Sequence, residues 1–551
     1  MTLHIADLVE HAVDVVPDNT ALIVNEQSLT YRELDEAANR IAHFFSSKEI
    51  RHGAHVGLFS RNTIEHVVVM LAALKIRATP INLNYRYTAA ELAYVAASGD
   101  LDAIFFERGF EATVATATSD IPRVRHFLVA EDGTPASGQL EATEYTQALA
   151  AGSPHRDFGQ RSADDLYILF TGGTTGYPKG VMWRHEDIWR VLGGGIDFIS
   201  GERLGEFDQA ERARVGPPMM TLPLSPLSHG AAVWATLMHL FAGHTTILLN
   251  KFDPIAAWST IDRYKVQIVF MTGDAMGRPL IEAYEAGGFD GSSLVAVASS
   301  AAVFSETIKR KWMTTFPNVM FTDSVGATEV GSSGVGLLTE ESINAEGPVV
   351  ALAPGTIVVD DDNNIIDPDA HVGRIVRTGR AGHVPLGYYG DQEKSKATFF
   401  EADGVRYAIT GDYARLEEGR RLTLLGRGSG CINTGGEKVF PEQVEMTLKA
   451  HPDVYDALVV GVPDERWGNR VSAVIQPRPD TRPTVASIQE HVRKHLAGFK
   501  VPRSIALVDE IPRHVTGKAN YPLAKQIMLE SLASGESSNL DDAPESHRSG
   551  Q

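Results

Sequence analysis

The sequence predicts an α/β protein with a large N-terminal domain of mixed, mostly parallel sheets with flanking helices, and a small α+β C-terminal domain. Three observations support this fold class. Short apolar runs alternate with helical stretches through the first half, turn-forming residues crowd together after about residue 350, and the alternation returns after about residue 428. Strand–helix–strand alternation is typical of parallel sheets that carry helices on their faces.

An amphipathic helix is predicted directly after Thr30. Thr30 and Glu33 have the spacing of a capping box, in which each side chain accepts a hydrogen bond from the other residue's backbone N–H. The apolar residues that follow share one helical face: Leu34, Ala37, Ala38, Ile41 and Phe45. Further helices are predicted from about residue 62 to 75 and from about residue 88. Strands are predicted at residues 55–59, 78–81, 103–106, 245–249, 267–270 and 294–298.

The domain boundaries follow from changes in composition along the chain. Residues 1–427 form the predicted N-terminal domain, and the turn signals predict a β-rich subdomain over about residues 350–427. The C-terminal domain is predicted over residues 428–533. Its expected elements are strands at 456–462, 471–476 and 504–508 and a helix at 487–496. Residues 534–551 have almost no apolar side chains, which predicts a disordered tail.

Charge and cysteine content exclude several classes of protein. The chain of 551 residues has 50 Lys and Arg against 70 Asp and Glu, a formal charge of −20 that opposes binding to nucleic acid. Cys431 is the single cysteine, so neither an intramolecular disulfide nor a Cys-rich zinc site can form. The longest apolar run, Val67–Leu74, is too short to span a bilayer. With no signal-peptide pattern, a soluble cytoplasmic protein is expected.

The strongest local signal is a loop of glycine and threonine that follows the apolar strand Tyr167–Phe170. Glycines let backbone N–H groups turn toward one point, hydroxyls add donors and Lys179 adds a positive charge, which together suit a polyphosphate. The loop is not a Walker A motif, because Lys179 precedes glycine instead of Ser or Thr. A flexible hairpin is the plain structural alternative. The residues of this candidate phosphate loop are Thr171, Gly172, Gly173, Thr174, Thr175, Gly176 and Lys179.

This loop resembles the phosphate loop of the adenylate-forming enzymes, which include acyl-CoA synthetases, adenylation domains of peptide synthetases and luciferases. Other motifs of that family follow in the same order along most of the chain. They are the acyl-pocket segment at Leu222–Gly230, the adenine and magnesium segment at Asp323–Glu329, the ribose turn Thr410–Asp412, the hinge opening at Gly426-Arg427, the glycine segment at Gly435–Pro441 and the lysine turn Thr516–Lys518. Each motif is weak alone, but their order makes the resemblance specific.

The resemblance implies a binding site for ATP and Mg²⁺. Lys518 would offset the charge that develops when a carboxylate attacks the α-phosphorus. Glu329, with the hydroxyl of Thr174 or Thr171, would bind Mg²⁺. Asp412 would hold the ribose, and Arg427 would donate to the same ribose or to the phosphate. His229 would enter the acyl pocket. Asp323 would accept a hydrogen bond from the adenine amino group, and Ser324 and Thr328 of the same segment would contact the nucleotide. Ser299, Ser300 and Ala301 are a looser match for the other side of the adenine.

The resemblance also implies a coenzyme A site and a mobile C-terminal domain. Gly435 and Gly436 correspond to glycines beside which the pantetheine arm passes, because a side chain would obstruct it there. Trp467, Phe499, Lys500 and Arg503 correspond to a set of aromatic and basic contacts to coenzyme A. A core aromatic residue is the structural alternative for Trp467. The hinge is expected at Ser429, where the C-terminal domain would rotate between half-reactions.

The sequence departs from the family pattern at three of these places, one of which is Asn433 in place of a common lysine. Val325 stands where an aromatic residue usually stacks on adenine, and Ser429 replaces the usual charged hinge residue. The residues of the segments at 182–187 and 426–441 resemble those of an actinobacterial branch of acyl-CoA synthetases. This branch includes ligases for sterol side-chain carboxylates and for fatty acids. Gly193–Gly195 either leaves room for a bulky ring system or ends a helix, and the helix end is favoured.

The function predicted from these motifs is ATP-dependent acyl-CoA ligation of a large apolar carboxylic acid through an acyl-AMP intermediate. Alternatives are an adenylation enzyme that loads a carrier protein, and luciferase-like use of the adenylate. An inactive nucleotide-binding regulator is disfavoured, since Lys518, Glu329 and Asp412 are all present. A dinucleotide-dependent oxidoreductase is disfavoured as well, because the chain has no Gly-x-Gly-x-x-Gly motif after a strand. The expected partners are the acid, ATP and coenzyme A, and a homodimer stays open.

Overall fold

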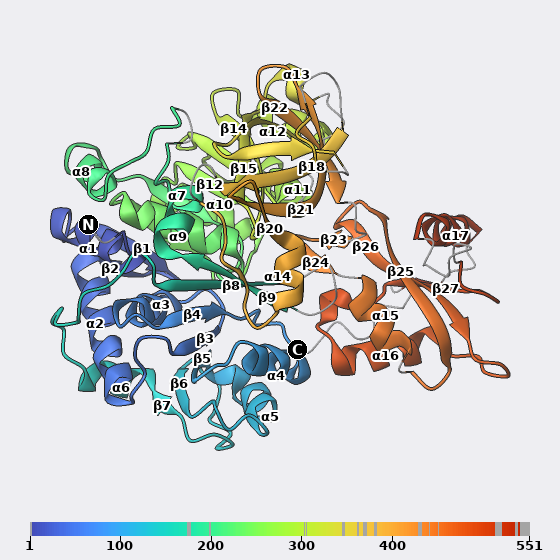
Figure 1. Ribbon diagram of the computed structural model, residues 1–551, viewed down its shortest axis with the longest axis horizontal. Coiled ribbons are helices and arrows are strands. Elements are labelled where there is room, and N and C mark those ends of the chain that lie inside the picture. Colours follow the sequence, from blue (N-terminus) through green and yellow to red (C-terminus); the bar gives the residue numbers. More distant parts are fainter. Residues whose placement is uncertain are drawn as a thin grey trace. The chain divides into compact units, whose positions relative to one another are not determined.

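The computed structural model divides into two compact units, which are described separately. The large unit comprises Met1–Tyr85, Leu92–Thr171 and Lys179–Gly426, and the small unit comprises Arg86–Glu91, Gly172–Pro178 and Arg427–Gln551. Figure 1 shows the chain coloured along its sequence. The structure describes residues 3–172, 178–197, 200–301, 304, 306–343, 348–360, 363–366, 372–379, 383–427, 432–439, 441–449, 451–512, 521–534 and 538–539.

A mixed sheet of 14 strands dominates the large unit. Neighbours from β14 to β1 pair in parallel, and the strands from β15 to β17 pair antiparallel. In spatial order the strands are β17 (Thr356–Val359), β18 (Val372–Thr378), β21 (Val405–Glu417), β22 (Arg421–Arg427), β16 (Val349–Leu352), β15 (Gly331–Leu337), β14 (Met320–Ala327), β13 (Ala296–Ser300), β12 (Ile268–Met271), β10 (Met220–Pro223), β11 (Thr245–Leu248), β1 (Thr20–Val24) and β2 (Gln27–Thr30), with β20 (Phe399–Ala402) beside β21.

Two further sheets complete the large unit. One is entirely parallel, which the alternating pattern predicts, and one is a small sheet that flanks the candidate phosphate loop. The parallel sheet runs β4 (Thr79–Asn82), β3 (His55–Phe59), β5 (Ala103–Glu107), β6 (His126–Ala130) and β7 (Thr143–Glu144); the small sheet runs β19 (Gly387–Tyr388), β9 (Pro178–Arg184) and β8 (Leu166–Gly172).

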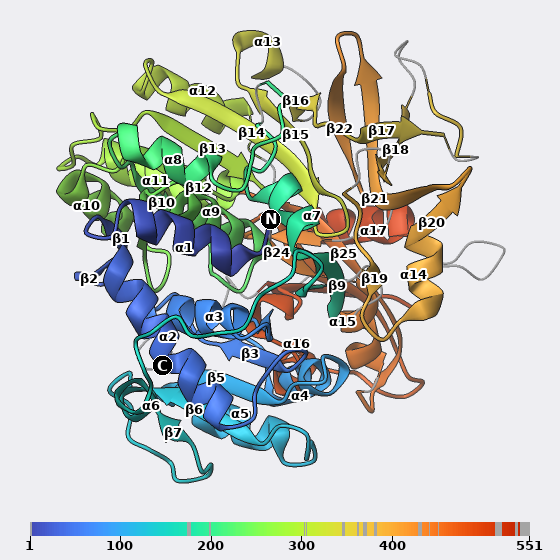
Figure 2. The same ribbon diagram turned by 60° about the vertical axis from the view of Figure 1, so that its left-hand side comes forward.

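Helices pack on both faces of the large sheet (Figure 2). One apolar cluster joins β1 of the large sheet with β3 and β5 of the parallel sheet through α1 (Ile5–Val15), α2 (Tyr31–Ser47), α3 (Ile64–Lys75) and α9 (Gly230–Phe241). A second cluster lies between β10, β12 and β13 and the helices α10 (Pro254–Tyr264), α11 (Gly273–Glu285) and α12 (Glu306–Thr315). The apolar run Val67–Leu74 lies within α3, and every residue of the run is buried. Other helices of the unit are α4 (Ala89–Ser98), α5 (Glu111–Thr118), α6 (Tyr145–Ala151), α7 (His185–Leu192), α8 (Asp208–Val215), α13 (Glu340–Ile343) and α14 (Gln392–Thr398).

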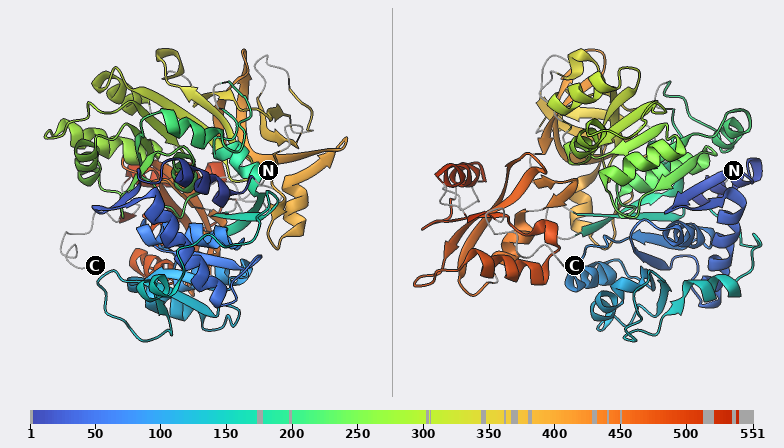
Figure 3. Two further views of the ribbon diagram at one scale, coloured as in Figure 1. Left: turned by 90° about the vertical axis from the view of Figure 1, so that its left-hand side faces the viewer. Right: turned by 180° about the vertical axis from the view of Figure 1, so that it is seen from behind.

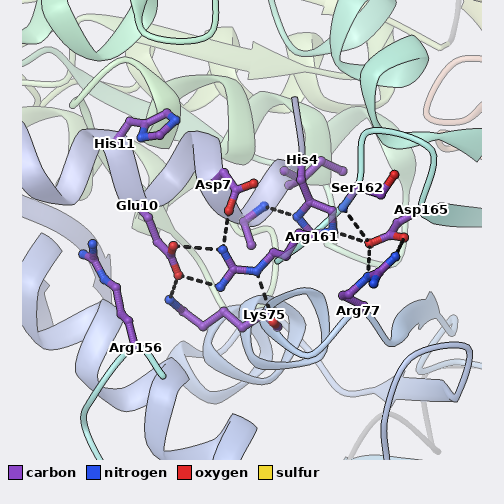
Figure 4. A network of polar contacts seen from close by, with 12 residues as sticks. His4, Asp7, Glu10, His11, Lys75, Arg77, Arg156, Arg161, Ser162 and Asp165 are labelled. Carbon is purple, nitrogen blue, oxygen red and sulfur yellow. Dashed lines mark hydrogen bonds and ion pairs between the residues drawn. The ribbon is translucent and has the colours of Figure 1, made fainter. Parts of the chain in front are cut away.

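Buried ion pairs fix α1 against the body of the large unit (Figure 4). The Arg161 guanidinium donates to both carboxylate oxygens of Glu10 at 2.9 Å and also to Asp7, and Lys75 of α3 pairs with Glu10. Burial alone would raise the pKa of Glu10, but Lys75 and Arg161 outweigh burial and lower the pKa to about 2. Because these contacts join residues far apart in sequence, α1 depends on the tertiary structure for its position.

The small unit is an α+β body around its own core. Its sheet has β25 (Val454–Asp464) and β26 (Gly468–Pro477) as a long antiparallel pair, and β27 (Ser504–Leu507) joins β26 in parallel. The remaining strands are β24 (Glu437–Val439), β23 (Ile432–Thr434) and β28 (Ser538–Asn539). The helices are α15 (Pro441–Lys449), α16 (Val485–His495) and α17 (Tyr521–Ser534). Figure 3 shows this unit in orange and red.

The predicted α/β fold class is confirmed, and the predicted strands and helices of both halves are present within a few residues of the expected positions. The antiparallel strands after residue 349 extend the same large sheet instead of forming a sheet of their own. The domain boundaries named above stay predictions. The predicted hinge Ser429 and nearly all of the predicted tail, 534–551, lie outside the described residues.

Candidate functional site

The candidate phosphate loop connects two strands of the small sheet. β8 ends at Gly172 and β9 begins at Pro178, while residues 173–177, with Gly173, Thr174, Thr175 and Gly176, lie outside the described residues. Gly180 must be glycine because a Cβ there would lie 2.7 Å from side-chain atoms of both Ile168 and Phe170. The close packing of β8 against β9 therefore holds both ends of the loop.

Lys179 and Glu329 lie in one neighbourhood despite their separation in sequence. The Lys179 ammonium pairs with Asp391 at 2.9 Å and lies 5.6 Å from the centre of the Tyr388 ring. The Tyr388 hydroxyl donates a hydrogen bond to Glu329 Oε1 at 3.1 Å. This arrangement places a cation and a carboxylate together at the beginning of β9, as a site for the phosphates of ATP with Mg²⁺ requires.

A buried asparagine, which the sequence analysis missed, ties two candidate segments together. Asn82 accepts a hydrogen bond from the backbone N–H of Phe170 at 3.0 Å and donates to the carbonyl oxygen of Ser228 at 2.6 Å. Asn82 therefore links the end of β8 to Ser228. The next residue, His229, is the N-cap of α9. Its position at the carboxyl end of a parallel strand is the signal that could have identified it.

The predicted adenine residues come from two parallel strands. The register of β13 and β14 pairs Ser300 with Ser324 and Ser299 with Asp323, and the Ser324 hydroxyl donates to the carbonyl oxygen of Ser299 at 3.3 Å. Directly after β13, Ala301 has φ +65°, a left-handed conformation that costs a non-glycine residue about 1 kcal/mol or more. Strained backbone of this kind is typical of binding sites at strand ends.

Asp323 belongs to a buried ion pair that the sequence analysis did not identify. Its carboxylate lies 2.6 Å from the ammonium of Lys309 on α12, and both side chains are 5% exposed. Burial raises the pKa of Asp323, while Lys309 opposes that rise. Lys309 therefore fixes the orientation of the carboxylate that we assign to adenine.

The other residues of the adenine and magnesium segment have separate roles. Val325 is buried in an apolar cluster with Val350, Ile375 and Leu422, so it packs in the core of the antiparallel strands. The turn after β14 is fixed by the Trp183 indole N–H, which donates to the carbonyl oxygen of Thr328 at 3.0 Å. Glu329 is the residue after Thr328, so the same hydrogen bond helps to position the Glu329 carboxylate.

Asp412 lies at an irregularity in the long strand β21. The register against β18 shifts between Arg374 and Val376, opposite Thr410–Asp412. There the Thr410 hydroxyl accepts a hydrogen bond from the N–H of Asp412 at 3.1 Å and donates to the carbonyl oxygen of Ile375 at 3.0 Å. Bulges of this kind redirect a side chain next to functional sites. Arg427 ends β22.

The candidate coenzyme A site of the small unit is built around Trp467. Gly435 donates its N–H to the carbonyl oxygen of Trp467 at 3.0 Å, and a Cβ on Gly435 would lie 2.7 Å from the indole ring. Gly435 and Gly436 both have positive φ, +57° and +83°, which suits glycine. The guanidinium groups of Arg466 and Arg503 lie over the indole at 4.7 and 5.0 Å. Trp467 thus serves as a stacking surface for two cations.

Two other predicted coenzyme A residues have different surroundings. The Lys500 ammonium lies 5.6 Å from the Phe499 ring, but it is buried and pairs with Glu91 at 2.6 Å in the same unit. A bound phosphate would have to compete with Glu91 for this cation. Thr516, Gly517 and the predicted catalytic Lys518 lie outside the described residues.

Two of the three glycines 193–195 pack against a tryptophan of the protein itself. α7 ends at Leu192 with Gly193 as its C-cap. A Cβ on Gly193 or Gly195 would lie 2.6 Å from atoms of the Trp189 ring. Gly193 therefore ends the helix as expected, and Trp189 occupies the space beside Gly193 and Gly195. Gly194, with φ +79°, instead faces Gln209 and Met238 and lines a cavity.

Taken together, the fold and the candidate site define a class of nucleotide-dependent enzymes that combine a large α/β unit with a small α+β unit. The chain belongs to the AMP-binding enzyme family: the family model matches residues 9–389, and the model of the AMP-binding enzyme C-terminal domain matches residues 443–518. The predicted resemblance to the adenylate-forming enzymes is confirmed.

Relatives of known function cover nearly the whole chain. A medium/long-chain-fatty-acid–CoA/3-oxocholest-4-en-26-oate–CoA ligase of Mycobacterium tuberculosis is 48% identical over 529 residues, which are 96% of each chain. A 3-oxocholest-4-en-26-oate–CoA ligase of Rhodococcus rhodochrous is 48% identical over 533 residues, 95% of this chain and 96% of the relative.

Solved structures share the fold at lower identity. The o-succinylbenzoate CoA synthetase of Bacillus subtilis has a TM-score of 0.79 at 19% identity and covers 94% of this chain and 98% of its own. The amide bond synthetase McbA of Marinactinospora thermotolerans has a TM-score of 0.77 at 23% identity, over 94% of this chain and 99% of its own. Among the described residues of this chain, no helix is both long and apolar enough to cross a bilayer.

Proposed function

We propose that the protein is an ATP-dependent acyl-CoA ligase that activates a large apolar carboxylic acid, either a steroid side-chain carboxylate or a medium- to long-chain fatty acid. The observation that carries the proposal is the 48% identity, over 96% of both chains, to a ligase named for these two acid classes. The grouping of Lys179, Tyr388 and Glu329 beside the phosphate loop supports it, because ATP must bind there through its phosphates.

The proposed reaction has two steps. A carboxylate oxygen of the acid attacks the α-phosphorus of ATP, an O–P bond forms, and pyrophosphate leaves with the electrons of the broken bond. The thiol sulfur of coenzyme A then attacks the acyl carbon, loses its proton, and displaces AMP. Mg²⁺ would neutralise phosphate charge, and the residues assigned to it are Glu329 and Thr174. Asp323, Ser324 and Ser300 would hold adenine, and Asp412 and Arg427 the ribose.

The second step assigns the residues of the small unit. Gly435 and Gly436 would border the path of the pantetheine arm, and Trp467, Phe499, Lys500 and Arg503 would contact coenzyme A. Lys518 would stabilise the adenylation transition state. Ser429 is the proposed pivot of the C-terminal domain, which we propose spans residues 428–533. We place the reaction in the cytoplasm, where ATP and coenzyme A are available. Loading of a carrier protein is the alternative acceptor reaction.

The first prediction tests this function. Purified protein with ATP, Mg²⁺, coenzyme A and a steroid or long-chain acid is expected to release pyrophosphate and AMP and to form free acyl-CoA. Chromatography of the nucleotides and thioesters measures all three products. ADP and orthophosphate in place of AMP and pyrophosphate would contradict the adenylate mechanism. Consumption of ATP without acyl-CoA, even though coenzyme A is present, would favour the carrier-protein alternative.

The large unit has a cavity that suits the distal end of such an acid. It has a volume of about 290 Å³ and lies at the C-terminal end of α9, where Leu204, Met238, Ala242 and His244 are among the residues that line it. His229 caps the opposite end of α9. At 1.5 Å per residue the two ends of this 12-residue helix lie about 18 Å apart, a distance that a steroid or long-chain acid could cover but a short acid could not.

The second prediction concerns this distal end. Met238→Trp is expected to lower kcat/KM for a steroid or long-chain acid about tenfold or more, because the indole fills the space that the tail would occupy. Activity with a short acid such as hexanoate should stay near the wild-type value, which serves as the internal control. Initial rates of pyrophosphate release with both acids measure the effect. An equal loss with both acids would contradict this placement of the tail.

A further inference from the structure

The first turn of α14 is fixed beside β9 by one carboxylate. Asp391 is the N-cap of α14, and its Oδ1 accepts a hydrogen bond from the backbone N–H of Lys394 at 3.0 Å. Its Oδ2 accepts from the Lys179 ammonium at 2.9 Å. Asp391 thus uses both oxygens to hold α14 against the strand that leaves the phosphate loop.

This anchoring brings a second lysine to Lys179. The Lys394 backbone N–H and the Lys179 ammonium bind the two oxygens of the same Asp391 carboxylate, so Lys394 begins beside Lys179. The Lys394 side chain is half-buried. Burial lowers the pKa of Lys394 to about 8, Lys179 adds to this effect, and the carboxylates of Asp391 and Glu329 oppose it. Two ammonium groups held side by side repel each other, and an anion between them would relieve that repulsion.

The surrounding residues indicate which anion fits. Lys179 follows the candidate phosphate loop, and Tyr388 connects the same place to Glu329, the residue assigned to Mg²⁺. We propose that Lys394 binds, together with Lys179, the terminal phosphates of ATP that leave as pyrophosphate. This inference rests on the proposed function and adds to it a phosphate-binding residue from α14, outside every motif that the sequence analysis used.

The same helix supplies a matched control. Lys396 lies two residues further along α14 and has the same charge as Lys394. Its side chain is exposed, so it does not share the site of Lys179. Replacement of Lys394 with arginine keeps a cation at the site. Loss of a charge-assisted hydrogen bond to phosphate is expected to weaken binding about tenfold or more.

Calorimetric titration with inorganic pyrophosphate in the presence of Mg²⁺ tests the inference. Lys394→Ala should raise the dissociation constant for pyrophosphate about tenfold or more, while Lys394→Arg and Lys396→Ala should stay within about threefold of wild type. The affinity for AMP, which lacks these phosphates, should not change in any variant. An unchanged pyrophosphate affinity in Lys394→Ala would overturn the inference, and so would an equal loss of AMP and pyrophosphate binding.

This titration needs no carboxylic acid and no turnover. If the wild type releases no AMP with any acid and the selective loss of pyrophosphate binding in Lys394→Ala is still observed, the proposed function is wrong and the phosphate site stands. If AMP release is normal in Lys394→Ala and pyrophosphate binds as in wild type, the proposed function stands and the phosphate site is wrong. The two failures are therefore distinguishable.

Discussion

Lys518→Ala is expected to lower the rate of acyl-adenylate formation by about 10²–10³-fold, because one charged donor aimed at the transition-state charge contributes on this scale. The same variant should still convert supplied acyl-adenylate and coenzyme A to the thioester at a near wild-type rate. The reason is that the second step forms no new bond to phosphorus. Pyrophosphate release measures the first half-reaction, and thioester formation from synthetic acyl-adenylate measures the second.

Gly436→Leu is the complementary variant, with the opposite expectation. A side chain there should obstruct pantetheine and slow thioester formation while pyrophosphate release continues. Because Gly436 has φ +83°, any side chain also strains the backbone by about 1–2 kcal/mol. Gly419→Leu is the matched control: Gly419 has φ +73°, a Cβ there would meet no atom beyond its chain neighbours within 4 Å, and it lies outside the proposed coenzyme A site. Equal damage to both half-reactions in Lys518→Ala and Gly436→Leu would argue for a single fixed active site.

Local sequence signals predicted the secondary structure well where they did not depend on distant residues. The capping box of Thr30 and Glu33 begins α2 as expected, with both of its hydrogen bonds present, and the strand predicted at residues 55–59 is β3. The first helix, α1, was not predicted. Its polar residues Asp7 and Glu10 have partners at Lys75 and Arg161, and no local pattern links these positions.

In the candidate site, too, local motifs identified some residues, while residues that depend on distant contacts were missed. Motifs identified Lys179, Glu329, Asp323 and Asp412 because each stands beside glycines or threonines that make its segment recognisable. Asn82, Lys309 and Lys394 were missed. Each depends on a residue more than 10 positions away in the chain: Asn82 bonds to Ser228, Lys309 pairs with Asp323, and Asp391 joins Lys394 to Lys179. Such contacts arise only once strands and helices have packed, so single-sequence patterns cannot reveal them.

The pairing of Lys309 with Asp323 leads to the prediction with the largest effect on stability. Lys309→Met leaves a buried carboxylate without its counter-charge, which is expected to cost about 3–5 kcal/mol at pH 8. Lys311→Met is the matched control on the same helix. Its partner Glu285 lies 2.5 Å away and both side chains are partly exposed, so a loss of about 1 kcal/mol or less is expected. Urea unfolding followed by tryptophan fluorescence compares the three proteins.

The pH dependence of this loss identifies its cause. Burial already raises the pKa of Asp323 in the folded protein above its value in the unfolded chain. At a pH between the unfolded and folded pKa values, the folded protein therefore binds more protons than the unfolded protein. In that range the free energy of unfolding falls as pH rises. Removal of Lys309 raises the folded pKa further and extends that range upward, so the deficit of Lys309→Met should be larger at pH 8 than at pH 5. Lys309→Met/Asp323→Asn removes the buried charge and should recover most of the stability at pH 8. If the loss of stability is equal at both pH values and persists in the double variant, Lys309 acts through packing. The Asp323 carboxylate, which is assigned to adenine, would then not depend on Lys309 for its charge.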